Sequence, residues 1–223
     1  MSGAGTISIP ADRMAQALAS VLPHVSKDKT RPGLNAVHVC VDRGHLLFEA
    51  TDCYTMAIHR TPAVAKVSDD QTIEAWWDGD LDIIIGADDA KRVMALAKGV
   101  VAMLPVTIAV GENGWVEASV VAINGLRFRA VDGDFPKVRQ FVPPVADPPA
   151  SHLSFGPKNM AKVTASALAL KGRDKAAPSV IMLNGKGAAS PQVFTIGDDF
   201  LGLLMPVRVE DPSAARSSWD GLL

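Results

Sequence analysis

The strongest constraint on the fold is a pattern of elements that recurs three times along the 223 residues. Each copy opens with a short apolar strand, continues as an amphipathic helix and ends with three further strands. Ile9, Ile85 and Phe155 hold equivalent positions near the end of the opening strands, which gives periods of 76 and 70 residues. Repeats of this length indicate internal duplication of a β-α-β-β-β unit. Three such units predict an α+β protein in which helices cover one face of antiparallel sheets.

Hydrophobic periodicity predicts where the elements of each unit lie. The first unit is expected to have a helix at 11–22 and strands at 7–10, 37–42, 45–50 and 54–60. The second is expected to have a helix at 87–98 and strands at 83–86, 106–110, 115–123 and 126–131. The third is expected to have a helix at 157–171 and strands at 153–156, 180–183, 192–196 and 201–209. Asn-Gly pairs at 113–114, 124–125 and 184–185 predict hairpin turns, and the polar stretch 61–80 predicts an irregular connection.

Proline density suggests how the units are divided into domains. Residues 144–150 form a Pro-rich linker. Residues 1–143 are expected to form a complete domain of two units, residues 151–210 a half domain of one unit, and residues 211–223 a tail. A lone unit would leave a sheet edge uncovered, which predicts that two third units from different chains pair about a two-fold axis.

Composition argues against membrane-spanning and secreted proteins. No apolar run approaches the roughly 18 residues of a membrane span. The first ten residues lack the charged and then apolar pattern of a secretory signal. Cys40 and Cys53 stand outside any CxxC or His-rich context, as is typical of reduced thiols in a cytoplasmic protein.

Residues 51–54 (TDCY) interrupt the alternation between two apolar strands. This corner places Tyr54 and Met56 beside a tight polar loop, a composition that suits a peptide-binding surface. The simpler alternative is an ordinary meander corner in which Asp52 caps the loop.

The net charge of −2 conceals an uneven distribution. Three windows that hold the helices and the loops after them, 10–31, 87–98 and 157–175, have a net charge of +7, and the remainder has −9. A basic helix layer would attract the phosphates of duplex DNA without reading its sequence. The cations expected to face DNA are Lys27, Lys29, Arg31, Lys91, Arg92, Lys98, Lys158, Lys162, Lys171, Arg173 and Lys175.

The sequence holds no recognisable catalytic machinery. Asp132 with Asp134, and Asp78 with Asp80, are Asp-Gly-Asp turns without a His or Glu at ligand spacing. The chain also lacks a Gly-rich phosphate loop and a nucleophile motif. We therefore expect a non-enzymatic protein with no catalytic residues, no metal site and no cofactor.

Five short stretches resemble the bacterial sliding clamp, the β subunit of DNA polymerase III, and occur in the order found in that family. They are 9–10 (IP), 31–35 (RPGLN), 50–54 (ATDCY), 132–136 (DGDFP) and 204–208 (LMPVR). The resemblance implies a DNA clamp (processivity) fold in a shortened form. Residues 7–143 would match the family's middle domain, and residues 151–210 the second half of its last domain.

In that family a cleft grips short linear peptides of the polymerase, the clamp loader and repair proteins. The resemblance assigns the cleft wall to Leu34, Thr51, Asp52, Tyr54, Thr55, Met56, Pro136, Gln140, Phe141, Leu203, Met205, Pro206, Val207 and Arg208. Thr55 and Gln140 stand where basic residues are common in the family, so peptide preference is expected to differ. The resemblance also places Lys27, Lys29 and Arg31 on a loop that approaches DNA.

The expected function is that of a processivity factor that encircles or cradles duplex DNA and tethers DNA polymerase and clamp-loader type proteins. The alternative is a free-standing interaction module that binds the same peptides without closing a ring. Rings of the family contain twelve units, so four chains would close one and a dimer would form half of one. Residues 219–223 (WDGLL) are either a disordered terminus or a tethered peptide that occupies the cleft.

Overall fold

The computed structural model describes residues 5–65, 75–79, 81–111, 113–120, 123–142, 153–171, 178–183 and 190–208. Its helices are α1 (Ala11–Val21), α2 (Ala87–Lys98) and α3 (Pro157–Ala169), with 3₁₀ turns η1 (Leu22–His24) and η2 (Val138–Phe141). Strands of the first half are β1 (Gly5–Pro10), β2 (Ala36–Asp42), β3 (His45–Thr51), β4 (Thr55–Ala65), β5 (Ala75–Gly79) and β6 (Asp82–Gly86). Strands of the second half are β7 (Pro105–Val110), β8 (Trp115–Val120), β9 (Ile123–Arg129), β10 (Val180–Leu183), β11 (Gln192–Ile196) and β12 (Phe200–Leu204).

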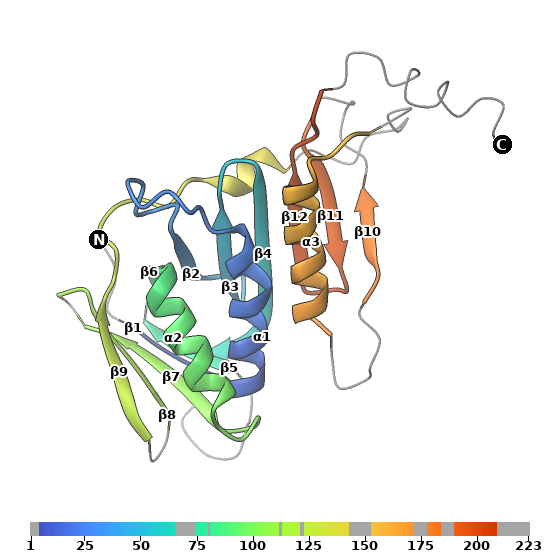
Figure 1. The fold of residues 1–223 in the computed structure, drawn as a ribbon. Helices are drawn as coiled ribbons and strands as arrows, with labels where there is room; N and C mark the ends of the chain where they lie inside the picture. Colours follow the sequence, from blue (N-terminus) through green and yellow to red (C-terminus); the bar gives the residue numbers. More distant parts are fainter. Residues whose placement is uncertain are drawn as a thin grey trace, which may run out of the picture.

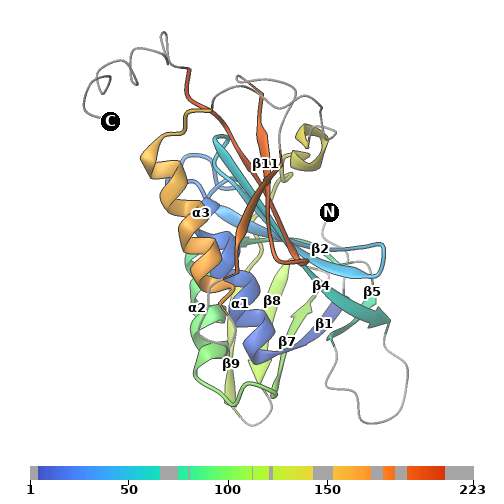
Figure 2. The same cartoon turned by 90° about the vertical axis from the view of Figure 1, so that its right-hand side faces the viewer.

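Strand β4 joins two sheets. Its first part pairs antiparallel with β3 and β12, and residues 63–65 pair parallel with β5. One sheet has the order β10-β11-β12-β4-β3-β2-β6, and the other has the order β4-β5-β1-β7-β8-β9. Helices α2, α1 and α3 lie side by side, and Figures 1 and 2 show them together on one face of the strands. The described residues therefore form an α+β fold of three helices and two largely antiparallel sheets, as the sequence predicts.

The apolar face of α1 explains why the helix layer packs where it does. Met14, Ala17, Leu18 and Val21 are completely or almost completely buried between the helix and the sheets. Spacings of three and four residues put these side chains on one face of the helix. The first backbone N–H groups of α1 donate to carbonyl oxygens of the loop after α2, with Ala11 N at 2.9 Å from Leu104 O. The loop thus supplies the acceptors that a side-chain cap would otherwise provide.

The first two units exchange their opening strands. Strand β1 pairs with β7, the second strand of the other unit, and β6 pairs with β2 in return. Both exchanges are antiparallel, which relates the two units by an approximate two-fold axis.

The third unit joins the first through β12, which pairs with β4 from Phe200↔His59 to Leu204↔Thr55. Beneath this ladder the ring of Phe194 lies over Gly202, where a Cβ atom would come within 2.5 Å of the ring. His24 is completely buried among Phe194, Phe200 and α3, and its Nε2 atom lies 3.0 Å from Ser166 Oγ. A continuous core therefore runs from the first unit into the third.

Three sequence predictions about the elements need correction. The described residues of the stretch 61–80 are not irregular, because β4 continues to Ala65 and β5 lies at Ala75–Gly79. The pair at 124–125 lies inside β9 rather than in a turn, since β9 already begins at Ile123. Residues 153–156 are described but form no strand, because no strand of the described chain lies beside them.

Some predictions fall outside what the structure describes. These are the turn at 184–185, the tail 211–223 and the whole of the linker 144–150. The division into residues 1–143, 144–150 and 151–210 stays a prediction. Within the described ranges, no helix combines the length and apolar character needed to cross a membrane.

Candidate functional site

The corner at residues 51–54 is built around the carboxylate of Asp52. Its Oδ1 atom accepts hydrogen bonds from the backbone N–H groups of Tyr54 (3.1 Å) and Thr55 (2.8 Å) and from the Thr55 hydroxyl (2.9 Å). The Thr51 side chain also stabilises the loop. Its hydroxyl donates to Thr55 O at 2.8 Å and accepts from Cys53 N at 3.1 Å. Cys53 is held at a φ of 73°, a conformation that non-glycine residues rarely adopt. Asp52 therefore caps the loop, and the cap presents the Tyr54 ring outward, 65% exposed.

The other carboxylate oxygen of Asp52 contacts the ammonium group of Lys162 on α3. Both side chains are largely buried, with exposed fractions of 16% and 20%. Burial alone would raise the pKa of Asp52, but the hydrogen bonds from Lys162 and Thr55 outweigh it and lower that pKa. The third unit thus fixes the corner of the first through an ionised pair.

An apolar cleft of about 360 Å³ opens beside this corner. Four segments form it: the corner with the start of β4, residues 136–141 after the first two units, Pro191 just before β11, and the end of β12 with Met205. Eight of its lining residues are among those assigned from the resemblance, namely Thr51, Tyr54, Thr55, Met56, Pro136, Phe141, Leu203 and Met205. The sequence reasoning missed three others, Cys53, Val138 and Pro191.

Six assigned residues lie elsewhere. Asp52 faces Lys162 behind the corner, and Gln140 lines a different cavity. Leu34 is bonded within the loop after η1, where its carbonyl oxygen accepts from Ser26 N at 2.9 Å. Pro206, Val207 and Arg208 follow β12 beyond the cleft lining, and Val207 N donates to Ser154 O at 2.7 Å.

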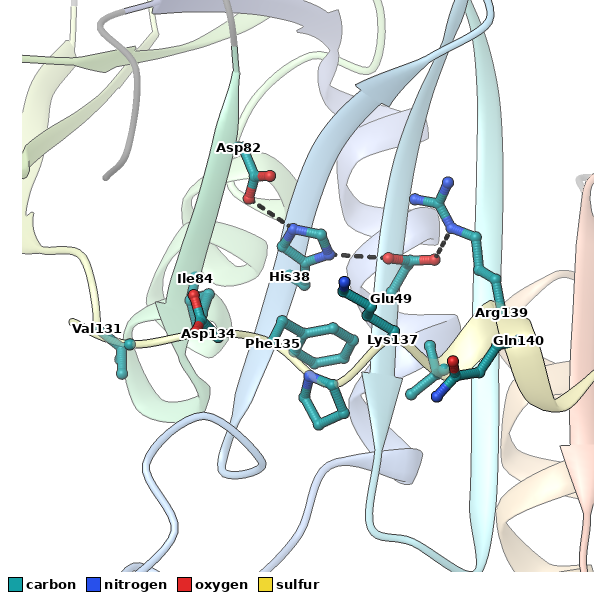
Figure 3. Close-up of a pocket in the computed structure, with 13 residues that line it drawn as sticks. His38, Glu49, Asp82, Ile84, Val131, Asp134, Phe135, Lys137, Arg139 and Gln140 are labelled. Atoms are coloured by element: carbon teal, nitrogen blue, oxygen red, sulfur yellow. Dashed lines mark hydrogen bonds and ion pairs between the residues drawn. The ribbon is translucent and has the colours of Figure 1, made fainter.

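Residues 131–142, which we call the strap, cross the sheet face opposite the helices (Figures 1 and 3). Arg139 anchors the strap with hydrogen bonds to Glu49 Oε1 and Asp42 Oδ2, both at 2.6 Å, and to Cys40 Sγ at 3.1 Å. The Phe135 ring stacks on His38 with centroids 4.8 Å apart. Since the strap also carries Pro136, Val138 and Phe141, these contacts position one wall of the cleft.

His38 bridges two carboxylates next to the strap, with Glu49 Oε2 at 2.8 Å from Nδ1 and Asp82 Oδ1 at 2.8 Å from Nε2 (Figure 3). Burial would lower the pKa of His38, yet the hydrogen bonds to Glu49 and Asp82 raise it above its ordinary value. Burial would likewise raise the pKa of Glu49, but hydrogen bonds from His38 and Arg139 lower it. The network therefore alternates positive and negative groups from Asp82 to Arg139.

A polar cavity of about 720 Å³ lies over this network and is lined by the strap from Val131 to Gln140. His38, Cys40 and Glu49 stand close enough together to suggest a metal site, with ligand atoms within 4.8 Å. However, Arg139 brings its own positive charge into this group, and burial raises the pKa of Cys40 to about 12. A protonated thiol beside a guanidinium suits neither metal ligation nor nucleophilic attack.

The cations expected to face DNA fall into three groups. Four form ion pairs: Arg31 with Asp28, Lys91 with Asp88, Arg92 with Asp89, and Lys162 with Asp52. Five are exposed, namely Lys27, Lys29, Lys98, Lys158 and Lys171. Arg173 and Lys175 lie outside the described residues. Lys162 is turned into the corner rather than outward, so the open helix face is less basic than the sequence windows indicate.

Comparison with known proteins connects this fold to one group. No protein-family model matches the chain, and no curated protein matches its sequence. Among solved structures, the DNA polymerase sliding clamp of Pseudomonas aeruginosa with a ligand matches 92% of this chain and 66% of its own, with 15% identity and a TM-score of 0.68. The same clamp bound to griselimycin gives a TM-score of 0.69 over 92% of this chain and 65% of its own, again at 15% identity.

The DNA polymerase III β subunit of Thermotoga maritima matches 92% of this chain and 65% of its own, at 12% identity with a TM-score of 0.65. The chain therefore spans slightly less than two thirds of the clamp chains that it matches, and the three helices and two sheets of its described residues correspond to two clamp domains rather than three. At this identity the likeness concerns the fold. The protein has the fold of the DNA polymerase III β sliding clamps and is clamp-like over nearly its whole length.

Proposed function

We propose that this protein is a sliding-clamp-like processivity factor that tethers partner proteins through the apolar cleft and cradles or encircles duplex DNA with its helix layer. The observation that carries the proposal is the cleft itself. Its walls come from the corner, the strap and β12, which are far apart in sequence and are held together by ion pairs at both ends.

The lining indicates which kind of ligand the cleft takes. Met56, Val138, Leu203 and Met205 offer an apolar floor, and the exposed ring of Tyr54 stands at its edge. Such a surface suits the apolar end of a short linear peptide. The charge of Asp52 is already neutralised by Lys162, so it does not favour a basic ligand. The proposed partners are DNA polymerase and clamp-loader type proteins that carry such peptides.

The two cysteines allow a test on the unmodified chain. Cys53 is exposed and lines the cleft, whereas Cys40 is buried and its pKa is raised to about 12. Iodoacetamide should therefore alkylate Cys53 first, and a short peptide with an apolar C-terminal end should slow that reaction. Griselimycin, which a clamp of this fold binds, serves as a second probe. Alkylation of Cys53 that stays equally fast at saturating peptide, with peptide binding measured separately, would place the peptide elsewhere.

A charge in the cleft floor gives the complementary test. Met205→Asp should weaken peptide binding by at least about 2 kcal/mol, because a carboxylate would be desolvated against apolar groups. Val101→Asp is the matched control, since Val101 is 69% exposed in the loop after α2. Equal affinity of both variants in calorimetry would contradict the proposed cleft.

The DNA part of the proposal rests on the exposed loop that carries Lys27, Lys29 and Arg31. Binding should be independent of sequence and fall steeply with salt. Replacing the three residues with Ala should flatten the slope of log K against log salt by roughly two to three units, at about 0.9 per phosphate contact. Arg43→Ala removes an exposed cation from the β2–β3 turn and should leave the slope unchanged.

The alternative function is a clamp-like interaction module that binds peptides without closing around DNA. The ion pairs of Arg31, Lys91, Arg92 and Lys162 favour it, because they reduce the positive charge available to phosphates. Peptide binding with no DNA binding at about 50 mM salt, where phosphate contacts are strongest, would select the module over the processivity factor.

A further inference from the structure

The third unit lacks the strand exchange that joins the first two units. In the first two units, each opening strand pairs with the second strand of the sister unit. The corresponding parts of the third unit are residues 153–156, which form no strand, and β10, whose outer side is a sheet edge in the described chain. The unit therefore presents a strand without an acceptor and an acceptor edge without a strand.

A common rule fixes the register of the two complete exchanges. Pro10 directly precedes α1 and pairs with Pro105, the first residue of β7. Gly86 directly precedes α2 and pairs with Ala36, the first residue of β2. Gly156 directly precedes α3, and the first residue of β10 is Val180.

Side-chain direction fixes the register in the third unit. The equivalent pairs, Ile9 with Val106 and Ile85 with Val37, point into the core beneath the helices. On β10 the residues that face this core are Val180 and Met182, which lie opposite Ile196 and Phe194, whereas Ile181 points to the other face of the sheet. Phe155 packs against the same core, so its partner on β10 is Val180 or Met182. The chain cannot make this pair within one copy, because residues 153–156 run beside residue 207 rather than beside β10.

Burial shows that the third unit lacks a neighbour at the same positions. Val106 and Val37 are completely buried, whereas Val180 and Met182, the core-facing residues of β10, are each 36% exposed. The helices show the same contrast. The fourth residue of α1 is Met14 and that of α2 is Ala90, both completely buried, whereas Met160 in α3 is 38% exposed.

We propose that two copies of this chain complete each other's third unit. Residues 153–156 of each copy pair antiparallel with β10 of the other, with Phe155 opposite the partner's Val180 or the partner's Met182, and the two α3 helices pack together as α1 and α2 do. The contact is isologous, since each copy gives one strand and receives one. It also covers the exposed backbone edges of the two β10 strands, which could otherwise pair with strands of other molecules. A second copy is the occupant because the exposed edge and the strand that fits it belong to the same sequence.

The oligomeric mass tests the interface. Light scattering at tens of micromolar should give twice the 23.5 kDa of one chain, or a larger even number of chains. Met182→Asp should halve that mass, because the carboxylate would be buried beneath the paired α3 helices. Met182 is already 36% exposed, so the monomer should stay folded by circular dichroism. Val101→Asp, at an exposed apolar site on the loop after α2, should keep the wild-type mass.

Cross-linking tests the register. In a Cys53→Ser background, Phe155→Cys combined with either Val180→Cys or Met182→Cys should oxidise to a disulfide-linked dimer, because directly opposed Cβ atoms in an antiparallel pair lie about 4.5–5.5 Å apart. Phe155→Cys with Ile181→Cys should not, because Ile181 points to the other face of the sheet.

A monomeric wild type, or a Met182→Asp variant with unchanged mass, would overturn the proposal. Disulfide formation by Phe155→Cys with Ile181→Cys in preference to both other double variants would overturn its register. None of these readouts depends on peptide or DNA, so they are independent of the proposed function.

Discussion

The ammonium group of Lys162 contacts the carboxylate of Asp52, and this ion pair joins α3 to the corner that carries the cleft. The same carboxylate holds the backbone of the corner through Tyr54 and Thr55. The shape of the cleft is therefore tied to the position of a helix that begins more than a hundred residues later. Four consequences of this and related contacts can be measured.

Lys162→Met should lower the free energy of unfolding by about 1–3 kcal/mol, because it leaves the largely buried Asp52 without its charged partner. Lys158→Met is the control, since Lys158 is an exposed residue of the same helix. Urea denaturation at pH 7 measures both. Equal midpoints for the two variants would mean that the ion pair does not stabilise the junction.

Stability should fall as the pH is lowered from 7 to 5.5. Burial lowers the pKa of His24 to about 3 and that of His59 to about 4, so the folded protein keeps both rings neutral. The unfolded chain takes up these protons near pH 6.5, which favours unfolding by up to about 1.4 kcal/mol per pH unit for each ring. His24→Gln should reduce this slope by up to about 1.4 kcal/mol per pH unit, because it removes one of the two buried rings. An unchanged slope in His24→Gln would show that His24 is not held neutral.

The raised pKa of His38 acts in the opposite direction, because its protonated form is stabilised in the folded state. That contribution is complete below pH 6.5 and is lost as the pH rises through the folded pKa. It is common to all the variants above and cancels when their slopes are compared.

Gly202→Ala should destabilise the junction between β12 and β4 by about 1–3 kcal/mol. The new Cβ atom would fall 2.2 Å from Phe194 Cζ and 2.9 Å from Met56 O, and neither the buried ring nor the ladder can move away cheaply. Phe194→Leu in the same chain should recover part of the loss, because it removes the nearest ring atoms. Thermal denaturation of the two single variants and the double variant measures the coupling, and strictly additive effects would argue against this clash.

Arg139→Met should weaken peptide binding about tenfold, or about 1.4 kcal/mol. It removes the bonds that hold the strap to Glu49 and Asp42, and the strap carries one wall of the cleft. Arg127→Met is the control, since Arg127 stacks on Trp115 at the far end of the other sheet. Calorimetry with one peptide measures the affinity of both variants. If both bound the peptide as tightly as the wild type does, the contacts of Arg139 would not be needed to position the wall of the cleft.

The sequence predicts the elements whose signal is local. Alternation in β2 and β3 and the apolar stripes of the three helices identify these segments without reference to their neighbours. The strand predicted at 153–156 fails for the opposite reason, because a strand exists only where a partner lies beside it, and the described chain supplies none. Likewise β5 escapes prediction because its pairing partners, β1 and β4, are distant and its surroundings are polar.

The site shows the same limit. Tyr54, Met56 and Met205 lie within recognisable short motifs, and the structure brings them to one cleft. Arg139, Glu49 and His38 carry no such signal, because their contacts join residues up to 99 positions apart. Val138 could have been found from its apolar character next to Phe135 and Pro136, whereas Pro191 is brought to the cleft by β11 alone.

The pairing of β12 with β4 has a thermodynamic consequence for any ligand of the cleft. Met56 lies on β4 and Leu203 directly opposite it on β12, so an occupant of the cleft bridges the seam between the first unit and the third. Binding and docking of the third unit are therefore linked, and each must strengthen the other by the same factor. At a peptide concentration of 100 times Kd, the seam gains about 2.7 kcal/mol against opening. A bound ligand would therefore stabilise the contact between the first and third units, so these two parts of the chain would be held most rigidly while the cleft is occupied.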